Sequence, residues 1–186
     1  MLSPQEEREI VEAVQRGLVQ PFARLVTAYQ GALFGFARRL CRNAAEAEDA
    51  VQEAFVRAYV GIGAFDGSRK FSTWLYAICL NVLRDGRRRR AVRGEAVDID
   101  EAGLADETAA PPEAAARGEQ GRMLEQALER LPEPLREAVV LRFLQGLCFA
   151  DVARVLGVSE NAARKRTYQG LLRLHDLLPR DWRPEE

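Results

Sequence analysis

The side chains best suited to binding chemistry gather in one stretch, Phe65 to Arg90, with the sequence FDGSRKFSTWLYAICLNVLRDGRRRR. It joins a polar turn and an aromatic cluster made of Phe65, Phe71, Trp74 and Tyr76. A predicted helix follows and finishes near Gly86, just before the run Arg87–Arg90. Adjacent cations repel one another unless water or a polyanion neutralises them, so nucleic-acid phosphate is a natural ligand. A solvated helix end that complements its own dipole is the alternative. Exposed rings beside cations can stack single-stranded bases, and this favours nucleic acid.

Carboxylates on another predicted helix, residues 44–59, raise the question of catalysis. Asp49 and Glu53 project with Gln52 away from the apolar stripe, and Asn43 is suited to cap the helix. Paired carboxylates can serve acid–base or metal chemistry, but no histidine or glycine-rich phosphate loop lies nearby in the sequence. We therefore predict no enzymatic activity, no metal site and no cofactor. The acidic face is interpreted as a protein-docking surface or a solvated one.

The cysteines and the histidine lead to the same conclusion. Cys41, Cys79 and Cys148 are far apart and lie in apolar helical contexts, without a CxxC pair. This spacing argues against zinc or a redox couple and predicts buried thiols. His175 is predicted to be a surface residue near a helix end.

A helix–turn–helix pattern follows later in the chain. A short predicted helix, residues 149–156, leads into the turn Gly157-Val158-Ser159 and then a longer helix to about Leu178. Ser159 is suited to cap the second helix. An ordinary corner between two helices with a charged face is the alternative to a DNA-binding unit. The second helix is expected to present outward the side chains of Glu160, Asn161, Arg164, Lys165, Tyr168 and Gln169.

The elements that must position these residues are all predicted to be helices. The chain has 186 residues, 47% hydrophobic and 30% charged, with a net charge of −1, as expected of a globular protein. Charge is uneven: residues 84–93 are basic and residues 95–119 are mostly acidic. Helical periodicity disappears from about residue 91 to 117, which predicts a flexible acidic linker. We predict an all-α fold with two small helical domains, 1–90 and 121–186, joined by a linker at 91–120.

Some details of these helices are also predicted. Ser72 or Thr73 is expected to cap the helix before the arginines, and Gly170 is expected to cost the later helix about 1 kcal/mol relative to alanine. The sequence has no signal peptide and no apolar run of membrane-spanning length, so a cytoplasmic protein is expected.

The order and spacing of three segments resemble bacterial sigma-70 family sigma factors, specifically the extracytoplasmic function (ECF) subgroup. The segments are AEDAVQEAFVRAY, FDGSRKFSTWLYAICLNVLRD and LPEPLREAVVLRFLQGLCFADVARVLGVSENAARKR. The resemblance covers about residues 9–90 (sigma domain 2) and 121–178 (sigma domain 4). It implies a subunit that binds core RNA polymerase and promoter DNA, with the linker in the polymerase interior and an anti-sigma factor as a further partner.

The resemblance also implies roles for individual residues. Asp49, Gln52 and Glu53 would meet the clamp helices of the polymerase beta-prime subunit, and the beta flap would be a second contact. The residues implied to bind the −10 element, with a flipped base, are Asp66, Ser68, Arg69, Lys70, Phe71, Trp74, Asn81, Arg84, Arg87 and Arg88. Those implied to bind the −35 element are Ser159, Glu160, Asn161, Arg164, Lys165, Arg166 and Tyr168.

Departures from the family pattern are informative. Ala77 and Ile78 stand where housekeeping members carry a tryptophan pair for melting DNA, which implies that melting depends on a close promoter match. Ala163 and Thr167 stand where larger apolar residues are frequent, so a marginal or shifted recognition helix is an expectation to test. A self-contained helix–turn–helix regulator is the alternative function. It would bind duplex DNA alone, usually as a symmetric dimer.

Overall fold

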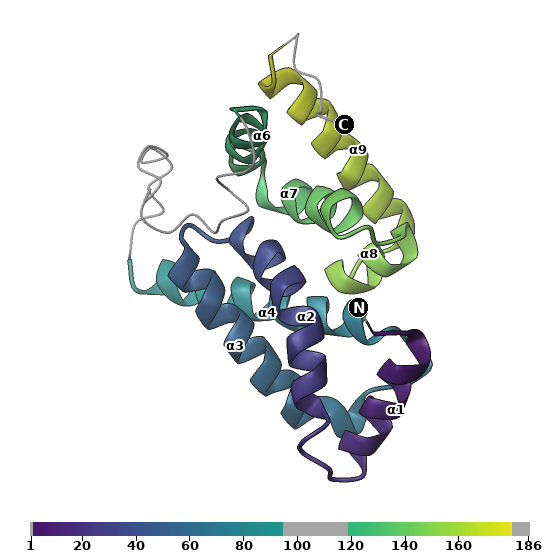
Figure 1. Ribbon diagram of the computed structural model, residues 1–186. Coiled ribbons are helices and arrows are strands. Elements are labelled where there is room, and N and C mark those ends of the chain that lie inside the picture. Colours follow the sequence, from purple (N-terminus) through teal and green to yellow (C-terminus); the bar gives the residue numbers. More distant parts are fainter. Residues whose placement is uncertain (1, 95–118, 180–186) are drawn as a thin grey trace.

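In the computed structural model, residues 2–94 and 119–179 are described, and they form an N-terminal and a C-terminal helical domain (Figure 1). The N-terminal domain contains α1 (Pro4–Gln15), α2 (Phe22–Arg38), α3 (Ala44–Gly61), the 3₁₀ turn η1 (Ile62–Ala64) and α4 (Phe71–Val92). The C-terminal domain contains α6 (Glu119–Glu129), α7 (Glu133–Val139), the π-helical turn η3 (Val140–Leu144), α8 (Phe149–Leu156) and α9 (Glu160–Leu177). The all-α prediction with two helical domains is confirmed.

Local sequence signals begin the N-terminal helices. Ser3 and Glu6 form a reciprocal capping box at α1. The Asn43 side chain accepts a hydrogen bond of 2.9 Å from the Glu46 N–H at the start of α3, as predicted. The apolar stripes of α2, α3 and α4 then pack together around fully buried residues such as Phe36 and Leu80. This packing leaves the opposite, polar side of α3 on the surface.

Helix α4 differs from the prediction at both ends. It begins directly at Phe71, and neither Ser72 nor Thr73 caps it. The Phe71 N–H instead donates to the Glu7 carboxylate of α1 at 3.2 Å, a partner 64 residues away that no local pattern reveals. Past Gly86 the helix continues to Val92, so the arginine run is helical and its side chains point in different directions.

The C-terminal domain contains the predicted helix–turn–helix. Gly157 ends α8 with φ +69°, a left-handed conformation that glycine adopts without strain. The Ser159 hydroxyl accepts the Ala162 N–H at 3.2 Å and caps α9, as predicted. These two residues set the direction in which α9 leaves the turn.

Gly170 has a packing role that the sequence did not reveal. A Cβ atom at this position would lie 2.5 Å from Val139 Cγ2, because α9 crosses α7 there at very close range. The small neighbours Ala163 and Thr167 are likewise buried. Helix α9 is continuous from Glu160 to Leu177, and its small residues allow the crossing. Whether it meets DNA in a shifted position stays a prediction.

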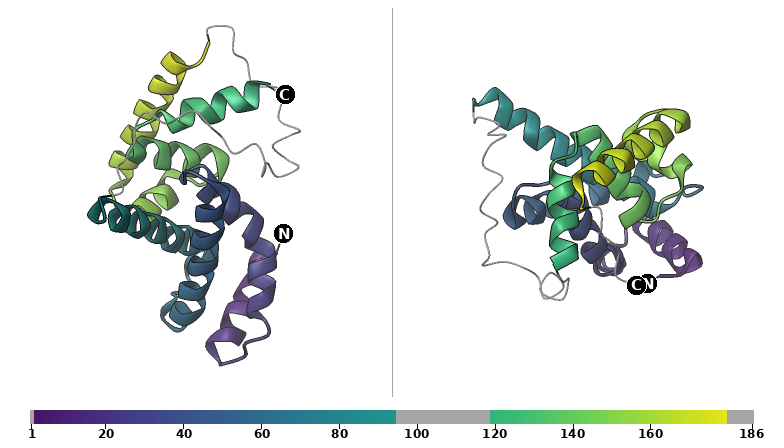
Figure 2. Two further views of the ribbon diagram at one scale, coloured as in Figure 1. Left: turned by 90° about the vertical axis from the view of Figure 1, so that its left-hand side faces the viewer. Right: turned by 90° about the horizontal axis from the view of Figure 1, so that it is seen from above.

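The two domains lie side by side. Helix α8 packs on α4, and η3 touches α2. Figures 1 and 2 show the two domains beside one another. Most of the predicted linker, residues 95–118, lies outside the described residues. The domain boundaries and the linker's flexibility therefore stay predictions.

The cap at Asn43 gives a stability prediction. We expect Asn43→Ala to lower the free energy of unfolding by about 1 kcal/mol, because the Glu46 N–H loses its acceptor. The melting temperature should fall by about 2–4 °C in a thermal circular dichroism scan. Asn43→Ser retains a capping oxygen and should melt close to the wild type. Equal losses in both variants would contradict the capping role.

Candidate nucleic-acid interface

The loop before α4 is shaped by its own side chains. Asp66 accepts a hydrogen bond of 3.0 Å from the Ser68 N–H and pairs with Arg69 at 3.3 Å. The Ser68 hydrogen bond, with Arg69 nearby, lowers the pKa of the Asp66 carboxyl below its usual range. Asp66, Ser68, Arg69 and Lys70 are all exposed. Four of the residues predicted for −10 binding therefore share one ordered, accessible turn.

The aromatic cluster is mostly core. Phe71 is fully buried at 0% exposure, and Phe65 is also buried. Their rings pack around Trp74, with centroid distances of 5.7 Å (Phe71) and 4.9 Å (Phe65), and only Trp74 is half-exposed. The prediction of exposed stacking rings is thus wrong for Phe65, Phe71 and the equally buried Tyr76. Phe71 cannot reach a ligand in this arrangement and instead supports Trp74 and the loop from inside the domain.

The arginines of α4 are neutralised by carboxylates of the same chain. Arg88 pairs with Asp85 at 2.7 Å, and Arg90 with Glu46 at 2.9 Å. Arg84 and Arg87 both pair with Glu137 of the C-terminal domain, at 2.6 Å and 3.1 Å. The arginine run was predicted to need solvent or a polyanion, and for Arg87, Arg88 and Arg90 protein carboxylates take that place here. The sequence pattern did not reveal Glu137, which lies 50 residues from Arg87.

Helix α9 carries the residues predicted for −35 binding on an accessible side. Glu160, Asn161, Lys165 and Tyr168 are exposed, and so is the capping residue Ser159. Arg166 is half-buried. These side chains come from just over two turns of one helix, a length that fits into a DNA major groove.

Arg164 is held on this surface by two contacts. Its guanidinium pairs with Glu160 at 2.6 Å and lies 4.4 Å from the centre of the Phe149 ring. The same ring approaches the Arg142 guanidinium at 5.1 Å. Cation–π contact restricts how the arginine can move while leaving its N–H groups available. Phe149, at the start of α8, is a residue that the sequence analysis missed.

A separate acidic surface lies on α3. Asp49, Gln52 and Glu53 are exposed together, as predicted. Glu53 pairs with Arg57 at 2.7 Å, the i,i+4 geometry expected from their spacing. Val56 and Val60 extend the same side of the helix and are exposed at 57% and 78%. The combination of carboxylates and exposed valines suits a protein partner better than water alone.

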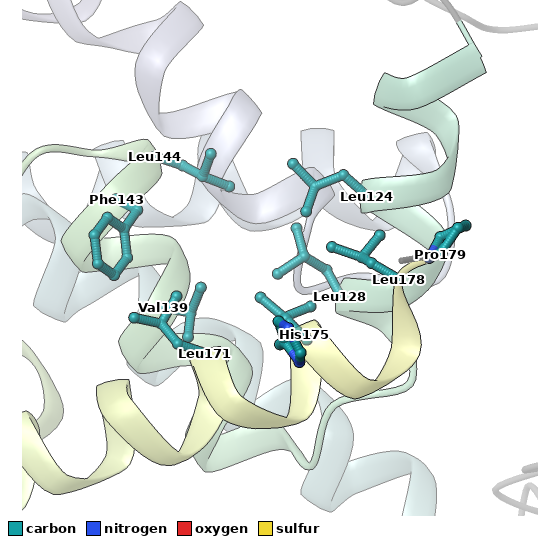
Figure 3. Close-up of a pocket in the computed structure, with 10 residues that line it drawn as sticks. Leu124, Leu128, Val139, Phe143, Leu144, Leu171, His175, Leu178 and Pro179 are labelled. Atoms are coloured by element: carbon teal, nitrogen blue, oxygen red, sulfur yellow. The ribbon is translucent and has the colours of Figure 1, made fainter. Parts of the chain in front are cut away.

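An apolar groove of about 370 Å³ opens in the C-terminal domain (Figure 3). Leu124 and Leu128 of α6 line one part of it, and Leu171 of α9 lines another. Phe143, at its edge, is 52% exposed. No site at these leucines is evident from the sequence, because helical periodicity alone does not distinguish a core face from an open groove.

The cysteines are not equivalent, and the prediction of buried thiols is wrong for one of them. Cys79 is buried and Cys41 half-buried, but Cys148 is exposed at the start of α8. Burial raises the pKa of the Cys41 thiol to about 11 and of the Cys79 thiol to about 12. Within residues 2–94 and 119–179, no group of three or more histidine, cysteine or acidic residues could hold a metal ion. His175 is exposed, as predicted.

This difference predicts an order of alkylation. With iodoacetamide at about pH 8, Cys148 should react first, because it is exposed, whereas burial shields the Cys41 and Cys79 thiols and keeps them protonated. Raising the pH toward 11 should bring in Cys41 before Cys79, since its pKa is lower. Peptide mass spectrometry gives the order, and denatured protein provides the control in which all three react alike. Equal labelling of the folded chain would contradict the burial.

Comparisons with known proteins cover both domains. Residues 25–93 match the family described as Sigma-70 region 2, and residues 121–174 match Sigma-70, region 4. The RNA polymerase sigma-H factor of Pseudomonas aeruginosa is 35% identical over 177 residues, 91% of this chain and 92% of the relative. The ECF RNA polymerase sigma factor SigW of Bacillus subtilis is 31% identical over 169 residues, covering 86% and 90%.

A solved structure extends the similarity to three dimensions. CnrH, in complex with the cytosolic domain of CnrY, superposes with a TM-score of 0.70 at 29% identity and covers 95% of this chain and 99% of its own. None of the helices in the part of the chain that the structure describes has the length and apolar content to span a bilayer. Two sigma-70 regions in the expected order, together with relatives aligned over nearly their whole length, show that this chain belongs to the ECF subgroup of the sigma-70 family of RNA polymerase sigma factors.

Proposed function

We propose that this sigma factor divides its work among four surfaces, two for core polymerase and two for promoter DNA. The exposed face Asp49, Gln52 and Glu53 docks on the beta-prime clamp helices. The groove of the C-terminal domain takes an apolar segment of the beta flap. The loop at 66–70 with α4 binds the −10 element, and α9 binds the −35 element. The observation that carries this assignment is that exposed cations lie in both domains, on the loop at 66–70 with α4 and on α9. The exposed carboxylates lie on α3, and the apolar groove is formed by other side chains, from α6, η3 and the later part of α9.

At the −10 element, the role proposed for each residue depends on how exposed its side chain is. Arg69 and Lys70 are accessible cations for backbone phosphate, and Trp74 offers a half-exposed ring on which a flipped base could stack. Asn81 is exposed and lies about two turns after Trp74 on α4, where it can hydrogen-bond a base edge. Arg84, Arg87 and Arg88 supply further phosphate contacts. Phe71 is left out of the direct contacts because it is fully buried.

At the −35 element, α9 is the proposed reading helix. Arg164 is the candidate for a bidentate contact with guanine, and Lys165 and Arg166 are candidates for phosphate. Ser159, Glu160, Asn161 and Tyr168 complete the contact surface. The cation–π contact with Phe149 positions the Arg164 guanidinium to enter the major groove of DNA.

We also propose that the chain performs no catalysis of its own and acts in the cytoplasm with the polymerase that it directs. CnrH is held by the cytosolic domain of another protein, and a comparable anti-sigma factor is proposed as the partner that restrains this chain. The alternative of a self-contained regulator is not favoured, because both domains match sigma-70 regions.

Runoff transcription tests the proposal. Core RNA polymerase with this chain and a genomic fragment library should produce transcripts from a defined set of promoters, whose aligned sequences give the −10 and −35 elements. Core alone, and this chain alone, are the controls and should produce none. Specific duplex binding by the chain without polymerase, together with no promoter-specific transcripts, would support the regulator instead.

A further inference from the structure

The C-terminal domain forms ion pairs with cations of the N-terminal domain that are proposed to bind DNA. Lys70 pairs with Asp151 of α8 at 3.1 Å. Arg84 pairs with Glu137 of α7 at 2.6 Å, and Arg87 pairs with the same carboxylate at 3.1 Å. Arg87 also contacts Glu133. The contact therefore joins surfaces of opposite charge, and its cationic side is the proposed −10 site.

Glu137 is the centre of this contact. Its side chain is only 2% exposed, and its two carboxylate oxygens accept hydrogen bonds from Arg84 in a fork and from Arg87. A buried carboxylate must be paired, and a forked pairing with arginine is the geometry in which arginine also holds a phosphate. Glu137 thus occupies Arg84 and Arg87 as a phosphate group would.

Contacts other than ion pairs also join the two domains at this interface. The buried Tyr76 hydroxyl donates to the Gln145 side chain at 2.6 Å. Thr73, Trp74 and Ala77 of α4 enclose a small cavity with Asp151 and Arg154 of α8. The other domain therefore covers part of the face of α4 that carries Trp74.

This arrangement cannot be the one that binds both promoter elements. Helix α9 packs on α8 and α8 on α4, so at interaxial distances of about 8–10 Å the axes of α4 and α9 are roughly 20 Å apart near the crossings. Elements centred at −10 and −35 are about 25 base pairs apart, which is about 85 Å along duplex DNA. The domains must separate before α4 and α9 reach their elements.

We propose that the free chain is self-inhibited: the C-terminal domain closes on α4, and Glu137 competes with promoter phosphate for Arg84 and Arg87. The proposal rests on the assignment of these arginines to the −10 element. Opening releases the two arginines, Lys70 and the Trp74 ring together, so binding to DNA and separation of the domains are coupled.

Full-length Glu137→Gln tests the closure, because it keeps the side chain's size and removes its charge. Small-angle X-ray scattering should show a radius of gyration about 10–20% larger than that of the wild type. Binding of a fluorescent, mixed-sequence single-stranded DNA of about 12 nucleotides should become about three- to tenfold tighter, because a larger fraction of the chain is open. Glu129→Gln is the control. It removes the same charge from an exposed site on α6 and should change neither quantity by more than the small gain expected from charge alone.

A second variant covers the case in which Glu137→Gln does not fold. Glu133→Gln with Gln145→Ala weakens the interface through residues that are not fully buried and should show the same two changes, to a smaller extent. An unchanged radius in the folded variants would overturn the closure. A larger radius with DNA affinity equal to that of the Glu129→Gln control would overturn the competition.

Transcription with core polymerase separates this inference from the proposed function. If the chain is self-inhibited, Glu137→Gln should retain promoter-specific transcription and reach half-maximal activity at a lower concentration than the wild type. A wild type that directs transcription but has the same radius as its variants would refute the closure alone. A wild type that directs none would refute the proposed function.

Discussion

Replacing Asp49 and Glu53 together by alanine is expected to abolish capture of core RNA polymerase while the chain remains folded. Both carboxylates are exposed on α3, and the buried side of that helix, with Val51 and Phe55, does not depend on them. Loss of one partner from a desolvated carboxylate–arginine pair costs about 2–5 kcal/mol, largely because the other partner is left buried and unpaired. That loss corresponds to roughly a 30-fold to several-thousand-fold weaker complex.

Co-purification with core polymerase gives the binding, and circular dichroism with thermal melting gives the fold. Arg57 loses its pairing with Glu53 in the variant but keeps Asp85 at 3.3 Å, so the helix should lose little stability. Glu9→Ala with Glu12→Ala removes two exposed carboxylates from α1 and should bind core normally. If the α3 variant melts like the wild type and still captures core, the docking assignment is wrong.

Arg164→Ala is expected to relax the choice of the −35 element. A bidentate arginine–guanine contact contributes about 1–3 kcal/mol of discrimination against a wrong base, so roughly 5- to 150-fold of preference should disappear at one or two positions. The structure supports Arg164 as the reading residue because Glu160 and the Phe149 ring hold its guanidinium at the accessible surface of α9. A scan of all single-base substitutions in the −35 element, with transcription as the readout, measures the change.

The control for this scan is Arg173→Ala, which removes an exposed arginine from the same helix about two and a half turns away. It should leave the base preferences unchanged and at most reduce transcription from all promoters alike, as loss of a phosphate contact would. Phe149→Leu should produce a weaker version of the Arg164→Ala pattern, because the guanidinium loses its cation–π support. An Arg164→Ala scan that matches the wild type would remove this residue from base reading.

The sequence by itself was enough to predict what depends on neighbours along the chain. Helical spacing of apolar residues predicted the all-α fold, because one buried stripe per helix requires that periodicity. The caps at Asn43 and Ser159 and the turn at Gly157 were predicted correctly, since each depends on only a few consecutive residues. The resemblance to sigma factors was equally visible, because it depends on the order and spacing of whole segments.

Only the tertiary structure decided which of these side chains are free to act. Phe71 was expected from the sequence to be an exposed ring beside cations, yet it is fully buried. Gly170 was expected to destabilise its helix, yet the close crossing of α7 requires a residue without a side chain there. Arg84 and Arg87 were expected to be free cations, yet both pair with Glu137 of the other domain. Burial, close helix crossings and ion pairs between domains depend on residues far apart in the chain that folding brings together. No local pattern specifies them, because the free energy of each contact depends on what the rest of the fold excludes from water.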